Sequence, residues 1–405
     1  MFLPGKNKRE KQQLIFMILL YQYLFWISFG LLVFPYIVYP LLLKILAIGK
    51  TSNAITYSVE ELPAISILIA AHNEEAVIEE KLQSIFSGNY PTEKLEVLIG
   101  SDNSTDRTNE IINALSKKYS HLKLTAFTER IGKVSIINKL AGTASNSILV
   151  ITDANVIFDK ETLVQLIRHF KSTAIALVDT NMLHKGLKRE GISYEESFYI
   201  RGEVSTKYNE GILWGTMMGP FGGCYALRKE YFTPVPENFL VDDFYINMKV
   251  LENGGKAITE VKALVFEDVS NELMEEFRRK IRIATGSFQN LFVFSHLLFR
   301  FNAISFCFLS HKVLRWKGPL FIIIAYISSL LLVNYNNFFH FAFYFETFLL
   351  GLVPMDFLLK QIGVHIRPLR LLRHFFFMNL AILIGMFKAF AGVKSSIWEP
   401  TLRNQ

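Results

Sequence analysis

Cysteine is scarce in this chain: its 405 residues include only Cys224 and Cys307, and the second lies in an apolar segment. Two cysteines placed in this way exclude a disulfide framework and indicate a reducing compartment for the globular part. The N-terminal apolar run lacks a small-residue cleavage site and is too long for the core of a signal peptide. We therefore predict that this run is a membrane anchor.

Excess charge is also modest, with a formal net charge of +7. The basic clusters flank apolar stretches, at 6–11, 278–282, 312–317 and 367–373. This placement suits anionic lipid headgroups or a phosphate-bearing ligand better than nucleic acid, which we do not expect as a partner.

Apolar residues, by contrast, are abundant: they make up 51% of the chain, with 36 phenylalanines. Such a share indicates that part of the chain lies in lipid. Most of the excess is at 13–49 and 317–392, whereas 51–290 has the composition of a globular domain. We predict an N-terminal anchor (1–50), a cytoplasmic globular domain (51–274), amphipathic interface helices (275–317), a transmembrane region (318–392) and a tail (393–405).

The N-terminal apolar stretch runs from Leu14 to Ile48 and contains a single charged residue, Lys44. It is longer than the roughly 20 residues of one crossing and too short for two crossings with a turn. We expect one crossing. Pro35 and Pro40 either kink one long helix or separate a span from an interfacial segment.

The C-terminal region contains three candidate spans, at 319–333, 338–359 and 375–390. The basic stretch 360–373 is expected on the cytoplasmic side and 334–337 outside, by the positive-inside tendency. One plus three crossings would place both termini outside, which conflicts with the basic N-terminus. The number of crossings and the side of each terminus therefore stay open.

Between these regions, short apolar runs alternate with segments of helical periodicity. The strand candidates are 65–71, 97–100, 124–127, 148–152 and 175–178. This alternation predicts an α/β domain with a mostly parallel sheet that is covered on both faces. Such sheets bind ligands at the carboxyl ends of their strands.

Polar residues follow three of these strand candidates, at 72–75, 101–106 and 152–155. Each segment alone also fits an ordinary turn or helix cap. Together, at the ends of parallel strands, they predict one crevice whose oxygen atoms could hold a base, a ribose and a divalent cation.

These motifs resemble the inverting glycosyltransferases of family 2, in the membrane branch of cellulose, chitin, hyaluronan and poly-N-acetylglucosamine synthases. The resemblance covers residues 60–320, with five motifs in the expected order. It implies a GT-A fold with transmembrane helices at both ends. It also implies that Ala71, Asn73 and Glu74 line the base pocket, that Asp102 binds the uracil or ribose, and that Lys133 lies near the nucleotide.

Asp153 and Asn155 occupy the two ends of the family's Asp-x-Asp motif, which implies a bound Mg²⁺ or Mn²⁺. The cation would stabilise the negative charge of the departing diphosphate. Because Asn155 offers a neutral amide oxygen, we expect weaker metal binding, or binding shared with the diphosphate and water.

Asp242 and Asp243 lie where the family has its Thr-Glu-Asp motif, whose last carboxylate is the general base. The resemblance therefore implies that Asp243 takes the proton of the acceptor hydroxyl, with Asp242 repelling it and raising its pKa, or else merely solvated. The glycine-containing segment 218–228 lies where the family has an acceptor-side loop.

The family's Gln-x-x-Arg-Trp motif is altered here to 279–283, with an isoleucine at the tryptophan position. Its surroundings predict an amphipathic helix at the membrane interface. Arg282 could pair with the departing diphosphate, with Arg279 beside the nucleotide, or the cluster could bind only headgroups. Ile283 cannot stack on a sugar, which argues against a processive polymerase unless another aromatic residue, such as Trp214 or Phe221, serves instead. The segments 311–316 and 398–403 are interpreted as interfacial anchors.

The sequence thus predicts a multi-pass enzyme of the cell membrane that transfers a sugar from a nucleoside-diphosphate donor, expected to be a UDP-sugar, to a lipid-linked or growing glycan acceptor. One alternative is a processive polysaccharide synthase that exports its product. Another is a non-catalytic GT-A component, which Asn155 and the altered arginine motif favour. Membrane partner subunits are compatible with either alternative.

Overall fold

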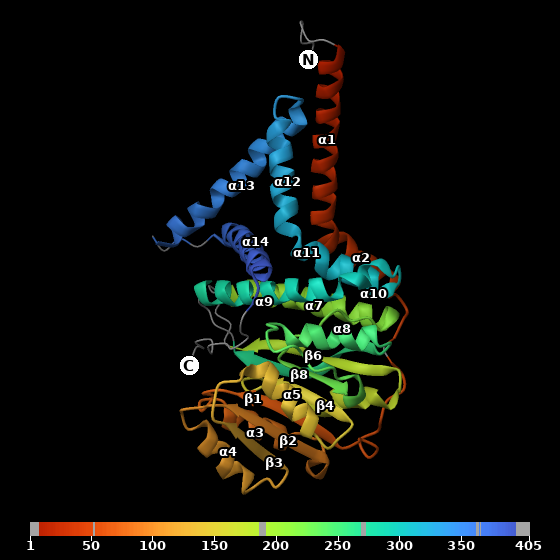
Figure 1. Cartoon of the computed structure of the whole chain (residues 1–405), viewed down its shortest axis with the longest axis vertical. Coiled ribbons are helices and arrows are strands. Elements are labelled where there is room, and N and C mark those ends of the chain that lie inside the picture. The colour runs from red at the N-terminus through yellow and green to blue at the C-terminus, as the bar shows by residue number, and fades with distance from the viewer. Residues whose placement is uncertain are drawn as a thin grey trace.

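The computed structural model describes residues 8–51, 53–185, 192–268, 273–361, 364 and 366–393. Its globular part is built on one sheet with the strand order β3-β2-β1-β4-β7-β6-β8-β5 (Figure 1). The strands are β1 (Ile65–Ala71), β2 (Leu95–Asp102), β3 (Leu122–Phe127), β4 (Ile148–Asp153), β5 (Ile157–Phe158), β6 (Ile175–Lys185), β7 (Cys224–Arg228) and β8 (Lys256–Asp268).

Most neighbouring strands are parallel, which confirms the predicted α/β sheet. β1 pairs in parallel with β2 and β4, β2 with β3, and β6 with β8. β7 is antiparallel to its neighbours β4 and β6, and β5 is antiparallel to β8. Since β7 reverses direction between them, β4 and β6 run the same way. The carboxyl ends of β1, β2, β4 and β6 therefore lie along one edge of the sheet.

The sheet is covered on both faces, as the continuous apolar strands predict. All residues of β1 are buried, and successive side chains point to opposite faces. Ile67 packs in one core cluster with Leu82, and Leu68 in the other with Ile137. The covering helices are α3 (Ile78–Phe86), α4 (Thr108–Ser116), α5 (Gly132–Thr143), α6 (Thr162–Ile167), α7 (Ile192–Trp214) and α8 (Asp242–Glu252).

β6 is much longer than its apolar run predicts, because it continues through the buried polar residues Asp179 and Thr180. The Asp179 carboxylate accepts a hydrogen bond from Lys207 Nζ of α7 at 2.6 Å. An ion partner makes a buried charge tolerable. Asp179 and Lys207 are far apart in sequence, so the apolar pattern could not predict that β6 continues past Val178.

A layer of helices separates the sheet from the upright apolar helices (Figure 1). The helices outside the globular part are α1 (Lys8–Val33), α2 (Tyr39–Leu46), α9 (Leu273–Phe294), α10 (Ala303–Cys307), α11 (Leu314–Trp316), α12 (Gly318–Leu331), α13 (Asn337–Gln361) and α14 (Arg367–Ala391). Two π-helical turns, Phe34–Val38 and Phe308–Val313, join α1 to α2 and α10 to α11. Short 3₁₀ turns occur at Thr92–Lys94, Arg168–Lys171, Lys229–Tyr231 and Ser295–Phe299.

Three helical segments of the described chain are long and apolar enough to cross a membrane: Lys8–Leu46, Asn337–Leu359 and Arg367–Ala391. The span expected at 319–333 is too short alone, because α12 ends at Leu331. It qualifies only together with the preceding segment Ala303–Trp316, from which it is bent by 61°. The predicted tail lies almost entirely outside the described residues.

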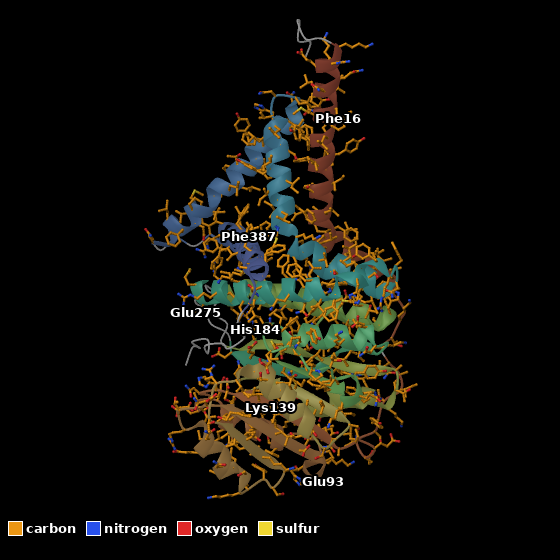
Figure 2. The ribbon with its side chains drawn as sticks, viewed as in Figure 1. Phe16, Glu93, Lys139, His184, Glu275 and Phe387 are labelled. Atoms are coloured by element: carbon orange, nitrogen blue, oxygen red, sulfur yellow. The ribbon has the colours of Figure 1, made fainter. Side chains whose placement is uncertain are left out.

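The surface of the upright helices is rich in exposed aromatic side chains, in contrast to the globular part. Figure 2 shows Phe16 on α1 and Phe387 on α14, which are 68% and 62% exposed, whereas the charged Glu93 and Lys139 lie on the globular part. Exposed aromatics on this scale fit contact with lipid rather than with water.

α9 joins the two parts of the molecule, since α14 lies directly against it. Phe277 of α9 packs on Phe377 with ring centroids 5.6 Å apart. Gly385 of α14 approaches α9 so closely that a Cβ atom there would lie 2.5 Å from Ala284 Cβ. The globular part is thus held directly beneath the apolar helices.

Candidate active site

Two loops at the carboxyl edge of the sheet, which follow β1 and β2, are tied together by hydrogen bonds. Asn73 follows β1 with a positive φ of 53°, and its side-chain oxygen accepts the Thr105 N–H at 2.8 Å. The Glu74 N–H donates to Thr108 Oγ1 at 2.8 Å. The predicted base-pocket residues Ala71, Asn73 and Glu74 therefore lie in one place, with Ala71 and Glu74 buried.

Asp102 ends β2 in this crevice, but its carboxylate is already occupied. It accepts the Ile131 N–H at 2.7 Å, the Gly132 N–H at 3.2 Å and Arg130 Nε at 3.0 Å. The side chain is completely buried. In this structure Asp102 holds the turn that starts α5, and so it fixes the position of Lys133.

Lys133 is the central cation of the site. Its Nζ lies 2.7 Å from Asp153 Oδ1 and 3.9 Å from Asp242 Oδ2. Burial disfavours the charged ammonium, but Asp153 and Asp242 outweigh this and raise the pKa of Lys133. The lysine is therefore held as a cation between two of the predicted site acids.

Asp243 lies beside this cluster in the first turn of α8, where its Oδ1 accepts the Phe244 N–H at 2.8 Å. Burial raises the pKa of Asp243, the negative charge of Asp242 raises it further, and Lys133 opposes both, with a result of about 7. A carboxylate with such a pKa can accept a proton near neutral pH.

The glycine-containing loop 218–223 closes over this carboxylate. A Cβ atom on Gly222, whose φ is +52°, would lie 2.7 Å from Asp243 Oδ2. The Gly223 carbonyl accepts hydrogen bonds from Asp153 N at 3.0 Å and from Thr152 Oγ1 at 2.9 Å. The loop thus lies between Asp153 and Asp243, where only glycine fits.

The oxygen atoms of this cluster suit a hard divalent cation. Asp242 Oδ2 is buried and accepts no hydrogen bond, and Asp153 supplies a second carboxylate. The Asn155 amide nitrogen donates to Glu267 Oε1 at 3.3 Å, so its amide oxygen is the atom for a ligand. Within the described residues no three His, Cys, Asp or Glu side chains form a metal-binding group. A cation here would need further oxygens from a diphosphate or water.

The two arginines of the altered motif differ in their surroundings. Arg279 Nε donates to Glu276 Oε2 at 2.8 Å, one turn earlier on α9. Arg282 is exposed at the crevice; surrounding protein atoms and Arg279 lower its pKa. The negative charges of Asp153, Asp242 and Asp243 oppose this lowering only in part, and Arg282 interacts electrostatically with all three acids.

Three residues that support the site are not among the residues predicted from the sequence. Arg130 Nη1 lies 2.9 Å from His72 Nε2, whose other ring nitrogen lies 2.7 Å from the Asp102 carbonyl oxygen. Lys81 is fully buried and donates to Thr152 Oγ1 at 2.9 Å and to the Val156 carbonyl oxygen. Burial lowers the pKa of Lys81 to about 7. A lysine within an apolar helix pattern, as at Lys81, is a sequence signal that indicates a buried cation.

The segment 311–316, interpreted as an interfacial anchor, is instead part of the protein interior. His311 is completely buried, and Trp316 packs edge-on against Phe244 with ring centroids 5.4 Å apart. The similar segment at 398–403 lies outside the described residues.

Parts of the chain are similar in sequence to known proteins. The model of Glycosyl transferase family 2 matches residues 66–233. A β-monoglucosyldiacylglycerol synthase of Nostoc sp. is 29% identical over 146 residues, which are 36% of this chain and 30% of that protein. A poly-β-1,6-N-acetyl-D-glucosamine synthase of Staphylococcus aureus is 32% identical over 114 residues, which are 28% of this chain and 27% of that protein.

The solved structure of a mannosyltransferase from Pyrobaculum calidifontis, in complex with GDP-Man and Mn²⁺, superposes with a TM-score of 0.68. It covers 92% of this chain and 99% of its own, at 20% identity, and so shows that the fold is shared. The chain spans less than a third of the length of the curated relatives it matches. Residues 66–233 thus match the model of glycosyl transferase family 2, and the chain has the GT-A fold.

Proposed function

We propose that this chain is a membrane-bound inverting glycosyltransferase that moves a sugar from a nucleoside-diphosphate donor to the hydroxyl of a lipid or a lipid-linked glycan. Its catalytic crevice would face the cytoplasm, where nucleotide sugars are made. The observation that carries the proposal is the cluster around Asp243. Asp243 lies beside Asp242 and under Gly222, next to the ion-paired Lys133, and burial raises its pKa. Lys133 and Gly222 lie in the segment that matches the family 2 model.

Asp243 would act as the general base. It takes the proton of the acceptor hydroxyl while the hydroxyl oxygen attacks the anomeric carbon of the donor. The bond from that carbon to the diphosphate breaks as the new glycosidic bond forms on the opposite face, which inverts the configuration. Gly222 lets the loop 218–223 approach Asp243 closely, because any Cβ atom there would lie 2.7 Å from Asp243 Oδ2.

The leaving group is a nucleoside diphosphate, and the cations of the site would stabilise its growing negative charge. Lys133 and Arg282 supply positive charge from two directions. Asp153, Asn155 and Asp242 offer the oxygens for a Mg²⁺ or Mn²⁺ ion, which would add Lewis-acid stabilisation of the diphosphate. The Mn²⁺ in the complex of the Pyrobaculum calidifontis mannosyltransferase is compatible with this assignment.

The position of the site favours an acceptor in the membrane. α9, which carries Arg282, packs against the apolar helix α14. The similarity to β-monoglucosyldiacylglycerol synthases supports a diacylglycerol-like acceptor, and the relative that makes poly-N-acetylglucosamine supports a growing glycan as the second candidate. Ile283, which cannot stack on a sugar, favours a single addition.

The test uses the full chain in lipid nanodiscs that contain diacylglycerol, supplied with Mg²⁺ or Mn²⁺ and, separately, with UDP-glucose, UDP-N-acetylglucosamine and GDP-mannose. Transfer of one sugar to lipid from a UDP donor is expected, with no product from the Asp243→Asn variant. Polymeric product would establish the processive alternative. The absence of transfer and of donor binding with every donor would support the non-catalytic alternative and contradict the proposal.

A further inference from the structure

A buried group of charged side chains lies where the anchor, the globular part and the interface helices meet. Glu203 and Glu210 belong to α7 and are seven residues apart, which places them two turns apart on one face of the helix. They are 6% and 0% exposed. Both are outside the crevice that contains Asp243, and neither takes part in the chemistry proposed above.

The first partners of these carboxylates come from the segment that precedes α12. His311 lies between them, with Nδ1 2.8 Å from Glu210 Oε1 and Nε2 2.8 Å from Glu203 Oε1. Arg315 Nη1 donates to Glu203 Oε2 at 2.5 Å, and Lys312 Nζ donates to Glu203 Oε1. Burial would raise the pKa of Glu203, but these three basic side chains hold it well below its ordinary value.

The N-terminal anchor supplies the second set of partners, from the place where α1 passes into α2. The Tyr39 hydroxyl donates to Glu210 Oε1 at 2.7 Å. Arg315 Nη2 donates to the Pro35 carbonyl oxygen at 3.1 Å, in the π-helical turn. Three segments that are far apart in sequence therefore share one hydrogen-bonded network.

The network reaches the candidate active site through a backbone contact of Glu210. Glu210 Oε2 accepts the Met218 N–H at 3.0 Å, at the start of the loop 218–223. The preceding carbonyl, of Met217, accepts Asn247 Nδ2 of α8 at 3.0 Å. The loop is thus held on one side by Glu210 and on the other by the helix that carries Asp243. We call the network of α7, His311, Arg315 and Tyr39 the membrane junction. From Met218 the loop continues to Gly222, which lies over the Asp243 carboxylate.

Such a network is an expensive way to join helices, because every buried charge loses its hydration. Apolar packing alone could hold α7 against the interface helices. Ion pairs, in addition, restrict how α7 can pack against its neighbours, since any shift of the helix leaves a buried charge without its partner. Here the arrangement that is fixed is that of the loop 218–223 relative to the membrane helices.

We propose that Glu210 and His311 are positioning residues for the acceptor: they hold the loop 218–223 in register with the membrane junction, so that an acceptor hydroxyl arriving from the bilayer meets Asp243. This inference rests on the proposed function. It assigns a role in acceptor use and none in donor binding, because Glu210 contacts the start of the loop at Met218. Lys133, in contrast, follows the turn that Asp102 holds.

The test compares Glu210→Gln and His311→Gln with a matched pair, His169→Gln and Glu260→Gln. His169 and Glu260 also form an imidazole–carboxylate pair, with Nε2 2.6 Å from Oε2, in which His169 is buried and Glu260 is partly buried. Among the described residues they have no hydrogen bond to the loop 218–223. Each full-length variant is assayed in diacylglycerol nanodiscs for the KM of the lipid acceptor and for kcat, and the Kd of UDP with Mg²⁺ is measured by calorimetry.

In Glu210→Gln and His311→Gln, the KM for the acceptor is expected to rise about tenfold or more, while the Kd of UDP stays within about twofold of the wild type. The matched pair should keep the KM of the wild type. An unchanged acceptor KM with a lower kcat, as expected from a smaller fraction of folded enzyme, would overturn the inference.

If a charge-removing variant fails to fold, Tyr39→Phe decides the question, because it removes only the hydroxyl that donates to Glu210. A rise of about twofold or more in acceptor KM supports the inference, and an unchanged KM contradicts it. A wild-type chain that neither binds UDP nor transfers sugar would instead refute the proposed function, which separates the two failures.

Discussion

Gly222 and Asp243 lie so close that any side chain at position 222 would meet the proposed base, with its Cβ 2.7 Å from Asp243 Oδ2. The positive φ of Gly222 adds backbone strain for any other residue. The close approach and the positive φ cannot be relieved by moving the loop, because this would break the hydrogen bond from the Asp153 N–H to the Gly223 carbonyl.

We expect Gly222→Ala to lower kcat about 100-fold or more while the protein stays folded, because the base or the loop must shift. Gly142→Ala is the control, since a Cβ on this α5 glycine would meet nothing within 4 Å. Sugar transfer and thermal unfolding of both variants are measured together. Full activity of Gly222→Ala would show that the loop does not limit access to Asp243.

The pH dependence of transfer should follow the ionisation of Asp243. Only the carboxylate can take a proton, so kcat/KM should rise with pH and reach half its maximum near pH 7. A profile measured from pH 5.5 to 8.5 tests this. A midpoint near pH 4, typical of an exposed carboxyl group, would argue against Asp243 as the base.

The same residue should lower the stability of the protein at high pH. Its pKa is higher in the folded chain than the roughly 4 of an unfolded one, so the protonated acid is favoured by folding, and that stabilisation is lost as pH rises through 7. Asp243→Asn should therefore be more stable than the wild type at pH 8, by up to about 4 kcal/mol, and equally stable near pH 4. Thermal unfolding at the two pH values would detect the difference, and equal stability at both would contradict the shift.

The asparagine of the altered metal motif should limit cation binding. Asn155→Asp would add a carboxylate but would place it about 3 Å from Glu267, where the two charges repel. The double variant Asn155→Asp with Glu267→Gln should therefore bind Mn²⁺ in the presence of UDP several-fold more tightly than the wild type. Asn155→Asp alone should gain less. Calorimetric titration with Mn²⁺ measures both, and an equal affinity in all three proteins would remove position 155 from the metal site.

Arg282 should matter for the departing diphosphate, and its neighbour Arg278 should not. Arg278 pairs with Glu275 at 3.1 Å, and its side chain is 72% exposed, so it is a natural control. Arg282→Ala is expected to lower kcat about 10- to 100-fold, and Arg282→Lys should recover part of the loss. Equal effects of Arg278→Ala and Arg282→Ala would favour a role for the cluster in headgroup binding alone.

The sequence by itself determined the α/β architecture, because buried parallel strands require continuous apolar runs such as that of β1. It also determined which acids gather, since Asp153 and Asp102 follow strands whose carboxyl ends share one edge. The apolar helices near both ends could also be predicted from the sequence, because a helix that contacts lipid needs a long apolar run.

Only the tertiary structure decided what each polar group contacts. The nucleotide contact of Asp102 stays a prediction, whereas its bonds to the turn before Lys133 were not expected from the sequence. His311 was interpreted as part of an interfacial anchor, yet it lies between two buried carboxylates of α7. The physical reason is the same in both cases: apolar burial leaves a periodic pattern along the chain, whereas a hydrogen bond or ion pair depends on two groups that meet only when the chain has folded.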